Sequence, residues 1–167
     1  MVTLGPEHPD VAKALTNLAV TVRASGDLER AIALSQRAHA ILEAALGAGH
    51  PDVGKALGNL STLQIDANDF AAARASSERA LAIFESIHGP DHPLVANVLN
   101  NVALACRGLG ESTKAHAALE RSRAILEKSL GPDHPDVALA SCRRDRRRRA
   151  LAPSPGGARR SPPTRTP

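Results

Sequence analysis

Histidine is the residue in this sequence best suited to acid–base or metal chemistry, and four histidines recur at a fixed spacing. His8, His50, His92 and His134 lie 42 residues apart, and each is followed by proline. A constant interval of this length places side chains in a row along a repeated structure, not around one point. We therefore predict a structural role for each histidine within its own linker.

The sequence contains no other arrangement of residues that indicates catalysis. It has no acid–base pair, nucleophile triad, phosphate loop or zinc-ligand cluster at a recognisable spacing. The two cysteines, Cys106 and Cys142, are too few for a disulfide framework and are not spaced as zinc ligands. We therefore predict that the chain is not an enzyme and uses neither a metal nor a cofactor.

The histidines mark a 42-residue repeat. Three full copies can be aligned, over residues 4–45, 46–87 and 88–129, and a partial fourth covers 130–141. Repeats of this length stack into solenoids, because each unit buries its apolar face on its neighbours. The core must be aliphatic, since aromatic residues make up only 1% of the chain.

Each repeat is predicted to contain two helices. The first begins at the His-Pro step, because the residue before proline avoids the α region and proline fits the first helical turn. In the first repeat, Gly26 ends this helix and Asp27 caps the next one. The predicted apolar positions of the two helices recur at helical spacing; they are Val11, Leu15, Leu18, Ala19, Val22, Leu28, Ala31, Ile32, Ala38, Ile41 and Leu42.

The blocks "HPDVAKALTNLA", "GDLERA" and "RAHAILEAALG", with their equivalents in each copy, resemble the tetratricopeptide repeat of the 42-residue kinesin light chain type. The resemblance implies an all-α, right-handed solenoid of antiparallel helix pairs. A HEAT or armadillo array has a similar period but not this phasing. The family usually has a large residue where this chain has Val22, Gln64, Cys106, Ser35, Ser77 and Leu119, which predicts looser packing.

The resemblance also implies a protein-interaction module that binds a peptide segment of a partner in its concave groove, which the first helices line. The Asn of each "N-L" pair would hold the partner's backbone, since a carboxamide both donates and accepts hydrogen bonds. Helical spacing from these asparagines adds further candidates, including Thr16 and Ile65. The predicted groove residues are Lys13, Asn17, Val20, Arg23, Lys55, Asn59, Thr62, Asn97, Asn100, Asn101, Leu104 and Arg107.

A second role remains open for the asparagines. The asparagines could instead tie neighbouring first helices together. The four basic groove candidates indicate a partner segment that carries some negative charge.

Glu43, Glu85 and Glu127 also recur, each six residues after an arginine, which is not a same-face helical spacing. We expect them to lie on a solvated face, with an inter-repeat ion pair as the alternative.

The charge of +4 combines two opposed regions. Residues 1–141 contain 12 Lys+Arg and 16 Asp+Glu, a net charge of −4, and residues 142–167 contain nine Arg and one Asp, a net charge of +8. The second region is rich in Arg and Pro and has no apolar periodicity, which predicts disorder. Its abrupt start inside a repeat favours a truncated or frame-shifted end of a longer array. A basic arm that binds nucleic acid, an acidic partner or a membrane surface through electrostatic attraction is the alternative.

The sequence shows no signal-peptide pattern and no apolar run of about 18 residues that could span a membrane. Together with the low cysteine content, this predicts a cytoplasmic location. A second prediction from the incomplete fourth copy is that the chain is a fragment of a larger regulatory protein with a longer repeat array.

Overall fold

The computed structural model describes residue 5 and residues 7–130, and the regular secondary structure in this part of the chain is entirely α-helical. The helices are α1 (Pro9–Ala24), α2 (Leu28–Leu46), α3 (Pro51–Asp66), α4 (Phe70–His88), α5 (Pro93–Gly108) and α6 (Ser112–Leu130). Their lengths alternate between 16 and 19 residues, so each 42-residue repeat forms one helix pair.

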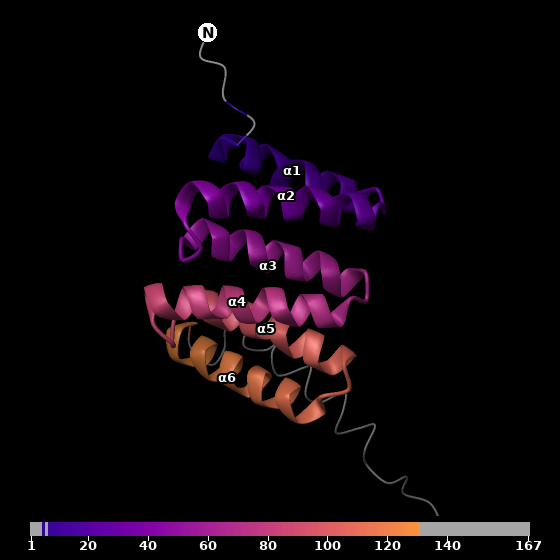
Figure 1. Cartoon of the computed structure of the whole chain (residues 1–167). Helices are drawn as coiled ribbons and strands as arrows, with labels where there is room; N and C mark the ends of the chain where they lie inside the picture. The colour runs from indigo at the N-terminus through magenta and orange to yellow at the C-terminus, as the bar shows by residue number, and fades with distance from the viewer. Residues whose placement is uncertain (1–4, 6, 131–167) are drawn as a thin grey trace, which may run out of the picture.

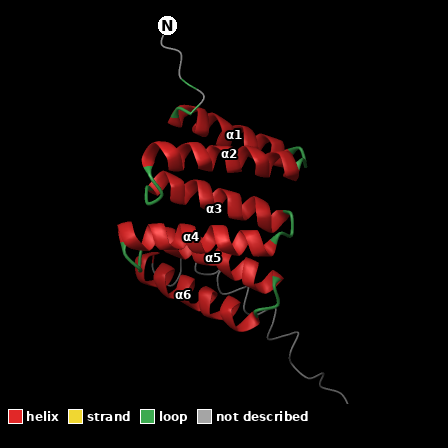
Figure 2. Ribbon diagram, viewed as in Figure 1, coloured by secondary structure: helices red, strands yellow, loops and turns green. Residues whose placement is uncertain are grey.

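The helices stack in antiparallel pairs. Helix α1 packs on α2, α3 on α4 and α5 on α6, and each pair also packs on the next one through α2 with α3 and α4 with α5. Figure 1 shows the six helices layered in chain order, and Figure 2 shows the connecting loops alternating between the two sides of the stack, where the helices begin and end. The predicted all-α array of three full repeats is confirmed. The partial fourth repeat and the Arg-rich tail lie outside the described residues.

The recurring frame of the repeat begins with a histidine that caps the first helix. In each repeat the Nδ1 atom of the histidine accepts a hydrogen bond from the backbone N–H two residues later, at 3.2 Å. Proline follows at the first helical position, where no N–H is needed. The structural role predicted for His8, His50 and His92 is therefore confirmed, because each is the N-cap of the helix that follows it. His134 lies outside the described residues.

The turn inside each repeat depends on one residue with positive φ. Gly26 has a φ of 89°, Gly110 a φ of 78°, and Asn68 takes the same place in the second repeat with a φ of 60°. Glycine and asparagine are the residues that adopt this conformation most readily. The predicted N-cap is also confirmed, because the Asp27 carboxylate accepts a hydrogen bond from the Arg30 N–H at 3.1 Å.

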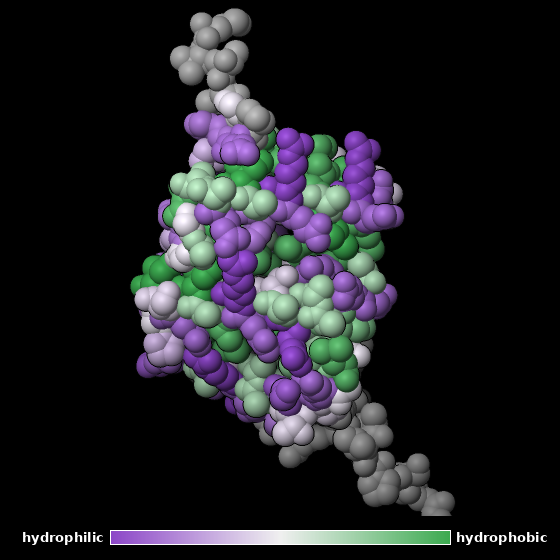
Figure 3. Space-filling view, viewed as in Figure 1, coloured by the Kyte–Doolittle hydropathy of each residue, from purple (hydrophilic) through white to green (hydrophobic). Residues whose placement is uncertain are grey.

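The core is aliphatic, as predicted, except for the buried ring of Phe84, and it is best developed in the second and third repeats. On the face in Figure 3, hydrophilic and apolar side chains are interspersed over the whole stack. Four of the family's large-residue positions are buried here with small or polar side chains, namely Ser35, Ser77, Gln64 and Cys106. One expected core residue differs: Leu18 is 44% exposed, although its equivalents Leu60 and Val102 are only 6% and 8% exposed.

Candidate functional site

The three asparagines of the predicted groove are not equivalent in the structure. Asn17 and Asn59 are exposed, whereas Asn101 is half-buried. The Asn101 amide nitrogen donates to Ser61 Oγ at 2.9 Å, to Thr62 Oγ1 at 3.2 Å and to the Gly58 carbonyl at 3.3 Å. All three acceptors belong to α3, so Asn101 links the first helices of the second and third repeats.

The reason for this difference lies one repeat earlier. The residues of α1 that correspond to Ser61 and Thr62 are Ala19 and Val20, which carry no hydroxyl group. Asn59, the equivalent of Asn101, therefore lacks these acceptors on α1. Its carboxamide stays at the surface, where both its donor and its acceptor are available to another molecule.

A small pocket lies beside Asn59, between the first and second repeats. It has a volume of about 80 Å³, and its lining combines hydroxyl, amide, guanidinium and aliphatic groups. The lining residues are Thr16, Ala19, Val20, Arg23, Ser35, Asn59, Thr62 and Leu63. Ser35 is one of the positions at which the sequence analysis expects a large family residue, and a large side chain there would fill the space. The short side chain thus helps to keep the pocket open.

The structure brings some of the predicted groove residues together at this pocket, and not others. Val20, Arg23, Asn59 and Thr62 line it, as does Thr16, which the spacing argument also selected. The remaining candidates do not line it; they are Lys13, Asn17, Lys55, Asn97, Asn100, Asn101, Leu104, Arg107 and Ile65. Ser35 and Leu63 were missed, because a sequence pattern does not show which core positions border a hollow.

The basic candidates carry less free charge than the sequence suggests. Lys13 lies 2.9 Å from Asp10, Lys55 lies 2.9 Å from Asp52, and Arg23 on α1 lies 2.6 Å from Asp66 on α3. The hydrogen bond from Lys13 holds the pKa of Asp10 below its usual range, and Lys55 does the same for the pKa of Asp52. Each of these three cations therefore already has an acidic partner within the chain.

The other candidates, in the third repeat, make specific contacts or stay at the surface. The Asn100 side-chain oxygen accepts a hydrogen bond from the buried Ser122 hydroxyl at 3.2 Å, so it serves packing between α5 and α6. Asn97 and Arg107 are exposed, and Leu104 is half-buried.

The recurring arginines and glutamates form ion pairs between repeats. Arg79 on α4 contacts Glu43 on α2, and Arg121 on α6 contacts Glu85 on α4 at 2.5 Å. The alternative of an inter-repeat ion pair is the one found, on side chains that remain partly exposed to solvent, because the repeat brings an arginine beside the glutamate of the previous repeat. Spacing within one helix could not show this contact, since its two residues lie 36 apart in the chain. We call this series the Arg–Glu ladder.

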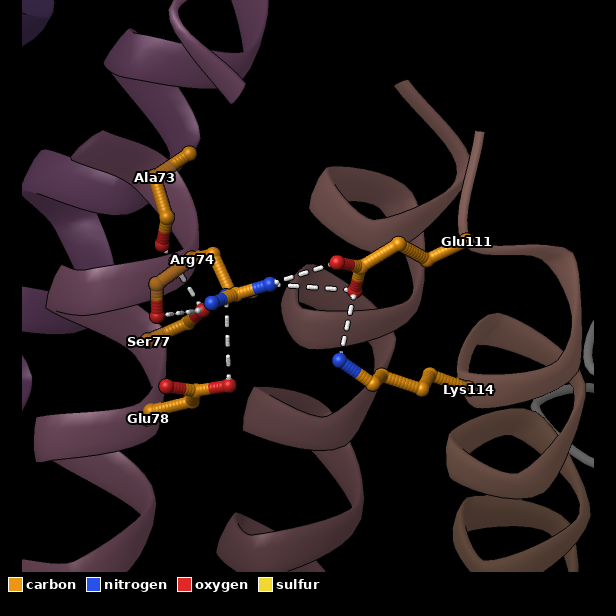
Figure 4. A network of polar contacts seen from close by, with 6 residues as sticks. All are labelled: Ala73, Arg74, Ser77, Glu78, Glu111 and Lys114. Atoms are coloured by element: carbon orange, nitrogen blue, oxygen red, sulfur yellow. Dashed lines mark hydrogen bonds and ion pairs between the residues drawn. The ribbon is translucent and has the colours of Figure 1, made fainter. Parts of the chain in front are cut away.

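A further polar network joins the second and third repeats (Figure 4). Arg74 on α4 donates two hydrogen bonds from one nitrogen to Glu111 at the start of α6, at 2.9 and 3.0 Å. Glu111 also lies 3.2 Å from Lys114, and Arg74 lies 3.5 Å from Glu78. The hydrogen bonds from Lys114 and Arg74 lower the pKa of Glu111. This network fixes the beginning of α6 against α4.

The described residues show no chemistry of another kind. Among residues 5 and 7–130, no group of three or more His, Cys, Asp or Glu side chains is arranged to hold a metal ion. Cys106 is a free, buried thiol whose pKa is raised by burial, so it stays protonated at neutral pH. None of the helices in the described part is long and apolar enough to cross a membrane.

Comparison with known proteins agrees with this architecture. A tetratricopeptide repeat family model matches residues 10–86 and 65–128. No curated protein matches the chain at a significant level. Several solved structures match the chain at a significant level.

A protein of Podosopora anserina, described as a kinesin light chain with nearly identical TPR-like repeats, is 25% identical, with a TM-score of 0.71 over 89% of this chain and 74% of that one. BtubC (BKLC) from P. vanneervenii is 20% identical, with a TM-score of 0.66 over 95% of this chain and 72% of its own. The N-terminal domain of stress-induced protein-1 from C. elegans is 15% identical, with a TM-score of 0.60 over 82% of this chain and 96% of that domain.

The last two similarities concern the fold alone. The family model, however, spans well over half of the chain, and the helix pairs follow its period. Tetratricopeptide repeats form a scaffold fold that is generally non-catalytic and typically mediates contacts between proteins. The chain belongs to the tetratricopeptide repeat family.

Proposed function

We propose that this chain binds an extended peptide segment of a partner protein along its first helices, with the pocket beside Asn59 as the principal contact. The observation that carries the proposal is the exposed Asn59 carboxamide at the edge of a hollow lined by Thr16, Thr62 and Val20. Every peptide unit offers one N–H and one C=O, and a carboxamide can pair with both. Recognition of this kind accepts many partner sequences.

The lining of the pocket defines the partner side chain that fits beside the peptide backbone. About 80 Å³ holds a small aliphatic or hydroxyl-bearing group, not a large aromatic ring. Because Arg23 is paired with Asp66 and the two lysines are paired with aspartates, the partner segment does not need a strong negative charge. We therefore expect binding that changes little with salt concentration.

The first experiment selects binding peptides from a random displayed library against the full chain. Affinities of the selected peptides are then measured by calorimetry for the wild type and for Asn59→Ala. We expect Asn59→Ala to weaken binding by about fivefold to tenfold, which corresponds to the loss of about one to two hydrogen bonds. Val20→Glu, which places a charge at the pocket wall, should weaken binding at least as much.

Gln36→Ala is the matched control, because Gln36 is an exposed carboxamide residue on α2, outside both the first helices and the pocket. It should leave the affinity unchanged. Selected peptides that bind Asn59→Ala and Val20→Glu as tightly as the wild type would refute the assignment of this pocket.

A further inference from the structure

The outward face of α1 is apolar and has no covering helix among the described residues. Its stripe consists of Val11, Ala14, Leu15, Leu18 and Val22, which lie at helical spacing on one side of α1. Leu18 is 44% exposed, and the other four are exposed or only half-buried. This stripe, which we call the α1 face, is distinct from the pocket beside Asn59.

Equivalent positions in the later repeats show what kind of structure covers such a face. Val53 and Val95, the equivalents of Val11, have no exposed surface, and Leu57 and Leu99, the equivalents of Leu15, are each 3% exposed. In those repeats the preceding helix pair packs on the helix that carries these positions, through α2 on α3 and α4 on α5. The α1 face therefore has the shape and composition that receive another helix pair of the same type.

The Arg–Glu ladder identifies which helix pair has the matching charge. At each junction an arginine of the later repeat contacts a glutamate of the earlier one, Arg79 with Glu43 and Arg121 with Glu85. Arg37 is the first arginine of this series; it is exposed and has no ion-pair partner in the described part of the chain. Glu127 is the last glutamate of the series.

Within residues 7–130, Glu127 contacts no arginine of another repeat. It contacts Arg123, four residues earlier, through Oε1 at 2.6 Å. Glu43 shows the same arrangement while it takes part in the ladder: Oε2 lies 3.4 Å from His39, also four residues earlier, and Oε1 contacts Arg79. A glutamate at this position thus holds a neighbour on its own helix and an arginine of the next repeat at the same time.

We propose that the chain associates head to tail with a second copy, in which the α1 face of one copy packs on the last repeat of another and Arg37 pairs with Glu127 of that copy. The contact continues the ladder and the helix stacking across the boundary between molecules. It is heterologous, so successive copies add in one direction. Association covers Leu18 in the way that Leu60 and Val102 are covered within the chain, which supplies the apolar driving force.

The test measures self-association of the full chain by sedimentation velocity over a wide range of protein concentration. The wild type should form species larger than the monomer as concentration rises. Arg37→Glu alone and Glu127→Arg alone should each raise the dissociation constant by about tenfold or more, because each places like charges opposite one another. An equimolar mixture of the two variants should restore association, since a contact that joins opposite charges then becomes available between unlike copies.

Two kinds of control variant separate this contact from general surface effects. Leu18→Glu should abolish association, whereas Val20→Glu, the same kind of change on the pocket side of α1, should not. Arg30→Glu, a charge reversal on α2 outside the ladder, should also leave association unchanged. Circular dichroism checks that each variant is folded.

The proposal is overturned by a wild type that remains monomeric at every concentration. It is also overturned if the mixed variants fail to associate, or if Val20→Glu and Arg30→Glu are as disruptive as the ladder variants. None of these measurements uses a bound peptide, so the result is independent of the proposed groove.

Discussion

The junction between the first and second repeats and the junction between the second and third are built on the same 42-residue frame, but different contacts hold them. Both contain a rung of the Arg–Glu ladder. At the second junction, Asn101 donates to two hydroxyl groups and a carbonyl on α3, and Arg74 contacts Glu111 through two hydrogen bonds. At the first junction the equivalents of Arg74 and Glu111 are Ile32 and Asp69, which form no such pair.

The ends of the first helices differ in the same way. At the second junction the Phe70 ring lies directly against Gly108, where a Cβ atom would be 2.2 Å from the ring. At the first junction Asp66 takes the place of Gly108 and pairs with Arg23 at 2.6 Å. The comparison shows that the frame sets the geometry of the stack, while a few equivalent positions decide whether a junction is closed by specific contacts or left with a pocket.

Truncation of a core leucine should have the largest effect and should separate the two ends of the array. Leu99→Ala removes a side chain that is 3% exposed and should cost about 2–5 kcal/mol in the free energy of unfolding. Leu15→Ala, at the equivalent position in α1, should cost less than half as much, because this side chain is only half-buried. Urea unfolding monitored by circular dichroism measures both. Equal losses would contradict the idea that the α1 face is uncovered.

Gly108→Ala should give the next largest effect, because the added methyl group collides with Phe70. We expect a loss of about 1–3 kcal/mol in unfolding free energy, as is typical of overpacking. Asp66→Ala is the matched control at the equivalent position, where a side chain already exists. It removes only an ion pair between partly exposed groups, so it should cost no more than about 1 kcal/mol. A neutral Gly108→Ala would show that the ring and glycine are not in firm contact.

Replacement of an asparagine by alanine should lower the free energy of unfolding by about 1 kcal/mol more at the second junction than at the first. Asn101→Ala leaves the hydroxyl groups of Ser61 and Thr62 without their donor and should cost about 1–2 kcal/mol. Asn59→Ala should change stability by less than about 0.5 kcal/mol, because its carboxamide is exposed. Urea unfolding again measures both.

Grafting the hydroxyl groups onto the first junction sharpens this test. Ala19→Ser combined with Val20→Thr provides the acceptors that α1 lacks. This pair of changes should stabilise the chain more when Asn59 is present than in the Asn59→Ala background, by about 0.5–1 kcal/mol in a double-mutant cycle. Absence of coupling would show that the hydroxyl groups alone do not account for the role of Asn101.

The pH dependence of stability should give the smallest effect, and it concerns the first junction only. Burial lowers the pKa of His39 from its ordinary value of 6.5. The negative charge of Glu43 opposes this shift, and the positive charge of Arg79 adds to it. The unfolded chain therefore binds more protons than the folded chain as the pH falls through and below 6.5. Stability contributed by neutral His39 is present above this pH and is lost as the solution becomes more acidic.

His39→Leu should remove that loss, because the equivalent residue in the second repeat is Leu81, which sits beside its own rung of the ladder. The difference in unfolding free energy between about pH 7.5 and about pH 5.5 should be smaller in the variant than in the wild type. An unchanged pH dependence in His39→Leu would contradict the assignment.

Most of the fold could be predicted from the sequence, because its signals are local and occur three times in phase. The His-Pro step, the Gly-Asp turn and the apolar spacing depend on contacts within a few residues, so each copy independently predicts the same helix pair. Even so, local reasoning did not identify His8 as the N-cap itself, since histidine is not among the usual capping residues. The Asn positions were found by family resemblance, not by physical necessity.

What the sequence determined by itself is the repeat frame: helix starts, turns, pairing order and an aliphatic core. The tertiary structure alone decided which copy of an equivalent residue is used, and for what. Asn101 forms a tie and Asn59 faces a pocket, because hydroxyl groups follow the frame on α3 but not on α1. Leu18 is exposed although Leu60 is buried, because burial depends on the neighbouring repeat and not on the residue's own helix. Contacts between residues about 36 to 43 positions apart carry no signal in a local pattern, and they are the contacts that make similar repeats chemically different.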